Sequence, residues 1–499
     1  MREISKLAVL ALLLAAPAGA ETVKLTLLGV GDVYNFEEED GRGGFARLNA
    51  VARAERAANP NTLYLFNGDM LSPSLASGFD KGQNTIDFTN LVPFDLAVPG
   101  NHEFDFGPEN FFEKMKASKY PWAAINITKD DGSAIEGLGG VMVKEVGGLK
   151  VALIPVAQDT SPEVSSTGSL KFLPTVETGV AAAEKAREEG ADLVVGVVQT
   201  NMENDRALMA SGAFDVILSG DDHSYATAFD GRTAYVETSI DGQFLSPVDL
   251  TVEVTTTEDG KREISWTPAF RFIDTATVTP DPESVAMADA LRATMDQNLN
   301  VEIGTVEAPL DSRRNVVRAE EATMGNLIAD AMRDATGADI AIMNGGGIRG
   351  DTTYEAGRKL TRRDILTELP FGNVTVVTEL PGSQVLLALE NGVSQVEKGA
   401  GRFAQVSGLT YAFDASAEPG SRVSEVMVGG APLEADKLYK VAVNDYILGG
   451  GDGYASLGGG RIITEGPTGQ LVANDVMAYV EKLGSVNLAV EGRIRKLGQ

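Results

Sequence analysis

Short runs of apolar, β-branched and aromatic residues recur in the first half of the chain, and polar residues follow each of them. Three such runs cover residues 23–28, 62–66 and 214–218. Runs of this length and composition predict buried β-strands. Because ligands bind at the carboxyl ends of strands in α/β sheets, we expect one site assembled from the segments that follow. These segments are Gly31-Asp32-Val33-Tyr34, Asn67-Gly68-Asp69 and Ser219-Gly220-Asp221-Asp222-His223.

The second half of the chain has a helical pattern followed by a strand and a glycine-rich turn. Apolar residues at 327, 328, 331, 332 and 335 have the spacing of one buried helix face. The run 339–343 predicts a strand that leads into Asn344-Gly345-Gly346-Gly347-Ile348-Arg349. Glycines let the backbone approach a ligand closely, and an arginine binds a phosphate through two parallel hydrogen bonds. Alone, such a turn is equally typical of a structural loop.

A segment of different character separates the two halves. Pro280-Asp281-Pro282-Glu283 opens an amphipathic run that ends near Asn300, and proline with acidic residues is typical of a helix start. We expect a linker helix over residues 278–301 between two α/β domains, residues 21–277 and 302–499. The alternative is that this helix is the first of the second domain. At 499 residues and 43% hydrophobic composition the chain is long enough for two cores.

The N-terminal segment predicts export. Arg2 and Lys6 precede an apolar run over residues 7–16, which leads to Ala18-Gly19-Ala20. This is the pattern of a cleavable signal over residues 1–20, so we expect a periplasmic or secreted protein. The chain has no cysteine, which excludes disulfide bonds and a lipid anchor on cysteine. No later apolar run is long enough to span a bilayer, so no membrane span is expected.

The formal charge of −29 narrows the choice of partners. Nucleic-acid polymers require a basic surface that displaces counterions from phosphates, so they are not expected as partners. A small anionic substrate would need local positive charge, supplied by a bound metal or by a few arginines.

The stretch Gly100-Asn101-His102-Glu103-Phe104-Asp105-Phe106-Gly107 has the composition of a phosphoester-hydrolysis site. Asn101 offers a carbonyl oxygen to a metal, His102 a proton or hydrogen bond to a phosphoryl oxygen, and Asp105 a partner that holds the imidazole in one tautomer. His102 is one of two histidines in the chain. The other interpretation is an Asn-His turn that opens a helix.

In order and spacing, these motifs resemble the metallophosphoesterase half of the 5'-nucleotidase and UDP-sugar hydrolase family. The resemblance covers most of residues 22–275 and implies a four-layer α/β/β/α sandwich with two metal ions at the strand ends. It places Asp32, Asp69, Asn101 and His223 where the family has metal ligands, and His102 and Asp105 where it has the catalytic pair.

Three positions depart from the family's metal-binding pattern. Tyr34, Asn201 and Asp221 stand where the family has histidine. Zinc favours nitrogen and sulfur ligands, whereas carboxylate and amide oxygens suit manganese, magnesium or calcium. We therefore expect an oxygen-rich site that prefers Mn, Mg or Ca over Zn, with Asn201 and Asp221 among its ligands. Tyr34 is either a phenolate ligand to iron or a packed aromatic residue.

Four motifs of the second half resemble the C-terminal domain of the same family. They are residues 344–349, 369–373 (Leu-Pro-Phe-Gly-Asn), 405–408 (Gln-Val-Ser-Gly) and 450–454 (Gly-Gly-Asp-Gly-Tyr), in that order. The resemblance implies an α/β substrate-binding domain. It further implies that Arg318 and Arg349 hold a phosphate, that Asn344 contacts the ribose, and that Phe371 and Tyr454 enclose the base.

These motifs together predict an exported, metal-dependent phosphohydrolase that removes phosphate from nucleotides. The family implies that ions bridged by Asp69 activate a water while His102, oriented by Asp105, stabilises developing charge. UDP-sugars and cyclic nucleotides are further substrates that the architecture allows. The alternative, which the three missing histidines favour, is a nucleotide-binding protein with a degenerate metal site.

Overall fold

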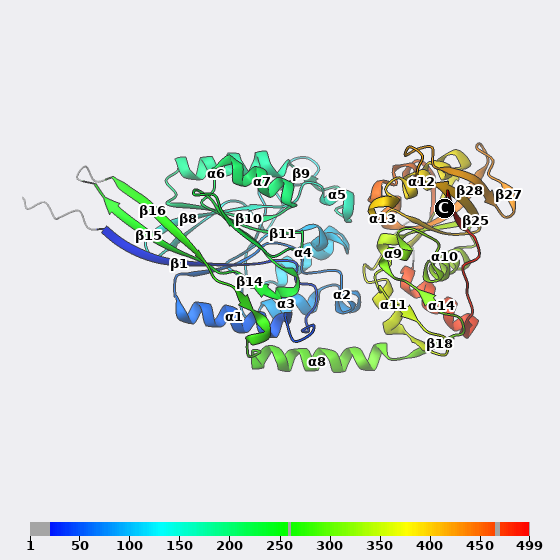
Figure 1. Cartoon of the computed structure of the whole chain (residues 1–499), viewed down its shortest axis with the longest axis horizontal. Coiled ribbons are helices and arrows are strands. Elements are labelled where there is room, and N and C mark those ends of the chain that lie inside the picture. Colours follow the sequence, from blue (N-terminus) through cyan, green and yellow to red (C-terminus); the bar gives the residue numbers. More distant parts are fainter. Residues whose placement is uncertain (1–19, 258–260, 465–469, 499) are drawn as a thin grey trace, which may run out of the picture.

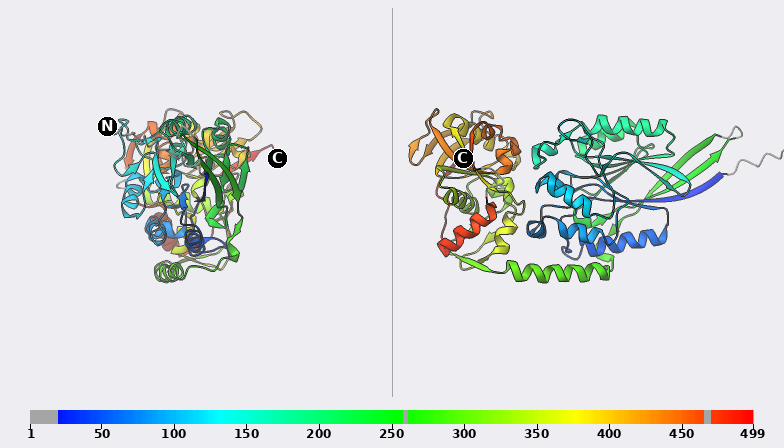
Figure 2. Two further views of the ribbon diagram at one scale, coloured as in Figure 1. Left: turned by 90° about the vertical axis from the view of Figure 1, so that its left-hand side faces the viewer. Right: turned by 180° about the vertical axis from the view of Figure 1, so that it is seen from behind.

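The computed structural model describes residues 20–257, 261–464 and 470–498. Two domains lie side by side along the long axis of the molecule, and helix α8 (Pro282–Leu299) runs along one side from the first to the second (Figure 1, Figure 2). The predicted signal falls outside the described residues except for Ala20. No described helix is long and apolar enough to cross a bilayer.

The first domain is built on two β-sheets that pack face to face. Leu25 and Leu27 of one sheet and Leu153 and Val195 of the other are buried in one core between them. Alternate residues point into this core because successive side chains of a strand face opposite ways. The first sheet has the order β16-β15-β1-β2-β3-β4-β6 and the second β12-β13-β11-β10-β8-β7. These strands are β1 (Ala20–Val30), β2 (Thr62–Phe66), β3 (Leu96–Ala97), β4 (Trp122–Ala123), β6 (Leu138–Gly139), β7 (Met142–Val146), β8 (Leu149–Val156), β10 (Leu193–Gln199), β11 (Val216–Gly220), β12 (Ala226–Phe229), β13 (Ala234–Glu237), β15 (Val248–Thr256) and β16 (Arg262–Phe270).

Helices cover the outer face of each sheet. Leu28 and Val30 of β1 belong to a core that also includes residues of α1 (Gly44–Ala58), α3 (Gln83–Thr89) and α4 (Gly107–Ala117). On the second sheet, Ile154 and Val194 pack with α6 (Thr175–Glu188) and α7 (Met202–Ser211). The layers follow the order helix, sheet, sheet, helix, which confirms the predicted four-layer sandwich.

The strands that precede the predicted donors run parallel to one another. In the first sheet β1 pairs with β2 and β2 with β3, and in the second β8 pairs with β10 and β10 with β11. Their carboxyl ends therefore meet at one edge of the stacked sheets. This edge faces the second domain (Figure 1).

Helix α8 contacts both domains. It begins after Asp281, whose carboxylate accepts a hydrogen bond from the backbone N–H of Ser284. Met295 and Leu299 are buried in the core of the first domain. Arg363 of the second domain donates to Asp296 of the helix at 2.6 Å. The helix lies within the predicted linker 278–301.

The second domain is built on a mixed sheet with the order β24-β20-β28-β23-β29. The predicted helix over 327–335 is part of α10 (Thr323–Thr336), which covers one face of the sheet together with α14 (Val472–Leu483). Helix α12 (Gly382–Val393) covers the other face. The strands are β20 (Ile340–Asn344), which is buried throughout and ends at the glycine-rich turn, β23 (Thr375–Pro381), β24 (Ala404–Ser407), β28 (Leu438–Asn444) and β29 (Arg461–Thr464).

Candidate active site between the two domains

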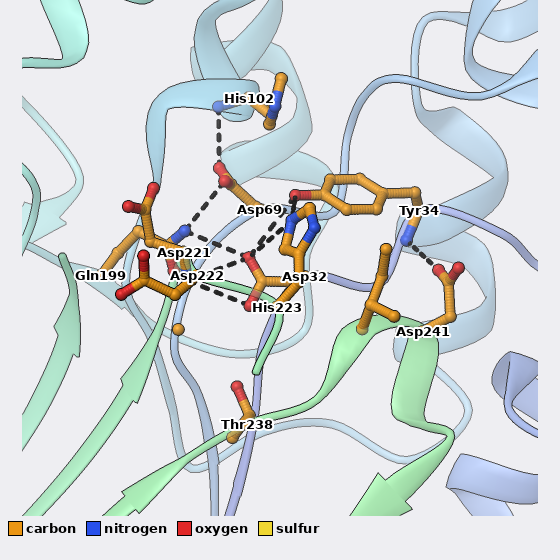
Figure 3. Close-up of polar contacts among 12 residues, drawn as sticks. Asp32, Tyr34, Asp69, His102, Gln199, Asp221, Asp222, His223, Thr238 and Asp241 are labelled. Carbon is orange, nitrogen blue, oxygen red and sulfur yellow. Dashed lines mark hydrogen bonds and ion pairs between the residues drawn. The ribbon is translucent and has the colours of Figure 1, made fainter. Parts of the chain in front are cut away.

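Acidic side chains from several loops meet at the carboxyl edge of the first domain's sheets (Figure 3). Asp32 follows β1, Asp69 follows β2 and Asp221 follows β11. Asp32 and Asp69 are almost fully buried, with 0% and 2% exposure. Burial raises the pKa of both well above the usual range, and it raises the pKa of Asp221 to about 6. Such a cluster requires hydrogen-bond donors or a cation beside it.

A glutamine lies between the two buried carboxylates. Gln199 donates Nε2 to Asp69 Oδ2 at 2.9 Å and to Asp32 Oδ1 at 3.3 Å. The backbone N–H of Asp221 donates to both oxygens of Asp32, at 3.2 and 3.1 Å. Gln199 is absent from the predicted site. Its position in the sequence would have indicated it, because Gln199 ends an apolar run and directly precedes a polar stretch.

Tyr34 and His223 close one side of this cluster. The Tyr34 hydroxyl lies 3.0 Å from His223 Nε2 and 3.5 Å from Asp32 Oδ1. Burial, together with the surrounding carboxylates, raises the pKa of Tyr34 well above its usual range. The Tyr34 ring is 6% exposed and packs edge-to-face with the rings of His102 and His223, which favours the packed aromatic interpretation of Tyr34.

The backbone is strained at the candidate donors. Positive φ angles occur at Asp32 (54°), Asp69 (67°), Asp221 (107°) and His223 (57°). Residues other than glycine rarely adopt this conformation, and clusters of them are typical of functional sites. Gly100 is required for another reason, because a Cβ there would lie 2.2 Å from Asp69 Oδ1. The close approach lets the N–H of His102 donate to that oxygen at 2.8 Å.

Glu103 organises the loops of the site instead of lining the cavity. It is 0% exposed. Its carboxylate accepts hydrogen bonds from four backbone N–H groups at 2.6 to 3.3 Å, those of Gly100, Asp69, Met70 and Leu71. One buried side chain thus holds the loop of Asp69 against the loop of His102. The sequence pattern contains Glu103 within its central motif without indicating this role.

Replacing Glu103 by alanine is expected to lower the free energy of unfolding by about 3 kcal/mol, because several buried N–H groups lose their acceptor. Urea unfolding followed by circular dichroism measures the change. Glu109→Ala, at an exposed glutamate of α4, is the matched control and should change it by no more than about 0.5 kcal/mol. Equal midpoints for the two variants would contradict the role given to Glu103.

The carboxylate of Asp105 orients the His102 ring. The Nδ1 atom of His102 lies 2.6 Å from Asp105 Oδ2, and the hydroxyl of Ser165 donates to Asp105 Oδ1 at 2.8 Å. Because Asp105 engages Nδ1, the other ring nitrogen, Nε2, remains for a ligand. The arrangement is the one predicted for these two residues.

A cavity of about 220 Å³ lies between the two domains. It brings together the predicted catalytic pair and four of the five predicted substrate-binding residues. The first domain contributes Asn101, His102, Asp105 and Ser166, and the second contributes Arg318, Asn344, Arg349, Phe371, Tyr446 and Asp452, among others.

Two arginines bring positive charge to this cavity. Arg318 is 8% exposed, and its Nε has no hydrogen-bond acceptor among the described residues. Burial lowers the pKa of Arg318 to about 10, so it stays charged at neutral pH. The Arg349 guanidinium lies 5.3 Å from the centre of the Phe371 ring and forms no ion pair within the described part of the chain. Both side chains are available to an anion.

The structure corrects the predicted position of Tyr454. Its ring is 0% exposed in the core of the second domain, where its hydroxyl donates to the Arg402 carbonyl at 2.5 Å. Tyr446 lines the cavity instead, and its hydroxyl accepts from the N–H of Asp452 at 3.1 Å. The aromatic pair at the cavity is therefore Phe371 and Tyr446. Tyr446 lies two residues beyond the end of β28, and its place just after a buried strand is the signal that would have indicated it.

Asn201 also differs from its predicted role. It is the N-cap of α7, and its side-chain oxygen accepts a hydrogen bond from the N–H of Asn204 at 3.1 Å. A helix that begins directly after β10 needs such an acceptor. The oxygen predicted to bind a metal is thus engaged by the backbone, and Gln199 reaches the carboxylates in its place.

Family models match both domains. A calcineurin-like phosphoesterase model matches residues 25–225, and a model of the 5'-nucleotidase C-terminal domain matches residues 302–459. Together with the four-layer sandwich and the cavity between the domains, these matches define a phosphoric ester hydrolase of the metallophosphoesterase class. The chain belongs to the 5'-nucleotidase family.

Several relatives that are similar in sequence or structure are nucleotidases or nucleotide phosphoesterases. The crystal structure of a 5'-nucleotidase precursor from Thermus thermophilus is 28% identical with a TM-score of 0.72, over 96% of this chain and 100% of that one. The snake venom 5'-nucleotidase of Naja atra is 26% identical over 94% of this chain and 98% of its own length. The trifunctional nucleotide phosphoesterase protein YfkN of Bacillus subtilis is 28% identical over 95% of this chain, which spans 35% of that protein. These similarities support a nucleotide phosphohydrolase at the level of the family.

The family implies divalent metal ions, but the donors of this chain do not fit them as they are arranged. The described residues contain no group of three or more His, Cys, Asp or Glu side chains that could hold an ion. Gln199 directs N–H donors at the two central carboxylates, whereas a metal ligand must offer a lone pair. The predicted preference for Mn, Mg or Ca depended on five oxygen donors, and one of them, the side-chain oxygen of Asn201, caps α7 instead.

Proposed function

We propose that the chain removes the phosphate group from a nucleoside monophosphate bound in the cavity between the domains. The base lies against Phe371 and Tyr446, and the ribose contacts Asn344 and Asp452. The phosphate lies between the two arginines of the second domain and His102 of the first.

The composition of the cavity carries this proposal. Aromatic rings bind bases by stacking, amides and carboxylates bind hydroxyl groups, and arginines bind phosphate. Asn344 Nδ2 donates to Asp452 Oδ2 at 2.7 Å, so these two residues form one polar corner. All three kinds of group line a single cavity, which is the combination that a nucleotide requires.

His102 supplies the proton chemistry of the proposed reaction. Attack of water on phosphorus breaks the bond to the 5'-oxygen, and negative charge develops on that oxygen. The protonated imidazole of His102 donates its Nε2 proton to that oxygen, while Asp105 accepts a hydrogen bond from Nδ1–H and stabilises the charged ring before the transfer. The released phosphate keeps both protons of the attacking water and returns one of them to His102, which restores the charged imidazole. Arg349 balances the charge of the phosphoryl oxygens. The products are the nucleoside and inorganic phosphate.

Phosphate release by the purified protein tests this function. AMP and UMP, 2',3'-cyclic AMP and UDP-glucose serve as substrates, and release is expected to be fastest from the monophosphates. A second candidate function is nucleotide binding without hydrolysis, which the contact of Gln199 with both carboxylates favours. Tight AMP binding in calorimetry without release from any substrate would select that candidate.

We also propose that the protein acts outside the cytoplasm. Residues 1–20 have the pattern of a cleavable signal. One relative is named for a snake venom. Both observations support export.

Replacing Tyr446 by alanine is expected to weaken AMP binding about 10-fold, because stacking of an aromatic ring on a base contributes about 1–3 kcal/mol. Tyr454→Phe is the control. It keeps the buried ring, removes only the hydroxyl, and should leave the dissociation constant within about twofold. Isothermal titration calorimetry compares them. Equal AMP affinity in the wild type and Tyr446→Ala would remove Tyr446 from the base site.

A further inference from the structure

We propose that the side-chain amide of Gln199 stands where a cation would bridge Asp32 and Asp69, and that this centre takes no divalent metal ion. The inference departs from what the family implies, and it depends on the contacts drawn in Figure 3. It stands apart from the proposed function, because it concerns the two carboxylates and not the nucleotide.

Gln199 satisfies the two carboxylate oxygens that face it. An amide nitrogen carries two hydrogens, and here one is directed to Asp69 Oδ2 at 2.9 Å and the other to Asp32 Oδ1 at 3.3 Å. A cation held by the same two oxygens would occupy the volume of this nitrogen. The ion and the amide therefore exclude each other.

The remaining oxygens of both carboxylates also have donors from the protein. Asp32 Oδ2 accepts from the N–H of Asp221 at 3.1 Å, and Asp69 Oδ1 accepts from the N–H of His102 at 2.8 Å. Buried carboxylates are tolerated when hydrogen bonds satisfy them. Uncharged donors meet this need here, so the fold does not depend on a cation at this place.

Packing holds the amide in position. Gln199 is 0% exposed at the end of β10. A Cβ added at Gly68 would lie 2.6 Å from Gln199 Oε1, and one at Gly220 would lie 2.8 Å from the same atom. The side chain fills space that exists only because these residues are glycines. It has little room to move aside for an ion.

The direction of the amide follows from its surroundings. Oε1 lies against the two glycines and accepts no hydrogen bond from any described residue. The opposite orientation would direct this oxygen at two carboxylates and would give neither of them a hydrogen. A cation bound between the carboxylates would favour that orientation, so metal binding distinguishes the two.

The consequence for the proposed function is that the phosphate is held by Arg318, Arg349 and His102 without an ion. If the proposed function holds, a chelator such as EDTA is expected to leave AMP affinity unchanged.

Metal binding by the intact chain tests the inference. The melting temperature of the wild type is expected to be the same within about 1 °C in EDTA and in about 1 mM manganese, magnesium or calcium. Calorimetric titration with manganese should give no binding heat. A rise of several degrees with any of these ions, or a stoichiometric binding isotherm, would overturn the inference.

Gln199→Glu sharpens this test. It removes both hydrogens and sets a third carboxylate between the other two, an arrangement that a cation stabilises. We expect the variant to melt lower than the wild type in EDTA and to gain about 5 °C in about 1 mM manganese. Gln405→Glu is the matched control: Gln405 is also 0% exposed, and its Nε2 donates to the Val317 and Glu320 carbonyls. This control should also melt lower, without recovery by metal.

The outcomes separate the inference from the proposed function. If neither the wild type nor Gln199→Glu responds to an ion, the amide is not what excludes the metal, and the inference fails. If the variant does not fold, the wild-type titration decides alone. Metal binding together with AMP hydrolysis would overturn the inference and leave the function intact. Absence of both in the wild type would leave the inference intact and remove the hydrolase function.

Discussion

Replacing His102 by alanine is expected to lower the rate of phosphate release from AMP by about 1,000-fold and to change AMP affinity by less than about threefold. In the proposed reaction the imidazole gives its proton to the leaving oxygen, so its contribution arises in the transition state and not in the bound substrate. Such a residue affects kcat far more than binding. Steady-state phosphate release and calorimetry on the same preparation measure the two quantities.

Two neighbouring variants make the His102 result specific. Asp105→Asn retains size and removes the charge that holds Nδ1, and we expect a loss in kcat of about 100-fold. Ser165→Ala removes only the 2.8 Å hydrogen bond to Asp105 and should have a smaller effect. Unchanged kcat in His102→Ala would exclude His102 from the mechanism.

Replacing Arg349 by alanine is expected to weaken AMP binding by about 100-fold, while adenosine binding changes by less than about threefold. A hydrogen bond to a charged group contributes about 1.5–3 kcal/mol, and an arginine can form two to one phosphate. Arg349 has no ion pair with the described residues, so its charge is available to the ligand. Calorimetry with AMP and adenosine separates phosphate from base and sugar.

Controls for Arg349 come from the same domain. Arg349→Met removes the charge and retains an apolar chain over Phe371, so it should lose AMP affinity and keep adenosine affinity. Arg461→Ala, at an exposed ion pair with Glu379 of 2.9 Å, should leave both unchanged. If wild type and Arg349→Ala bound AMP equally well, Arg349 would have no place in the site.

Both predictions depend on the way the domains face each other. The Phe371 ring is nearly parallel to the His102 imidazole, at 8° with the ring centres 6.4 Å apart. The Tyr446 hydroxyl donates to the Glu163 carbonyl of the first domain at 3.2 Å. In the proposed function, this arrangement brings a phosphate bound to the second domain next to the histidine of the first.

The fold could be predicted from the sequence because the signals for strands and helices are local. The apolar runs at 23–28, 62–66 and 214–218 lie in β1, in β2 and over β11, and the helical spacing at 327–335 lies in α10. The placement of His102 beside Asp105 was predictable for the same reason. Residues three apart at the start of a helical turn lie close together whatever the rest of the chain does.

Two site residues could not be assigned in this way. A motif marks Tyr454 as aromatic, but the packing of the second domain's core decides that its ring is buried. A family position marks Asn201 as a metal ligand, but the start of α7 requires its oxygen as a cap. In both cases neighbours brought by the fold determine what the side chain contacts.

By itself, the sequence determined the two domains, the strand ends that carry polar groups, and the pairing of His102 with Asp105. Only the tertiary structure decided that Gln199, 130 residues beyond Asp69, lies between the two carboxylates, and that Tyr446 faces the cavity. The reason is physical. Periodicity and capping depend on neighbours in the chain, whereas contacts between distant side chains depend on the order and register of strands and on the packing of one domain against the other.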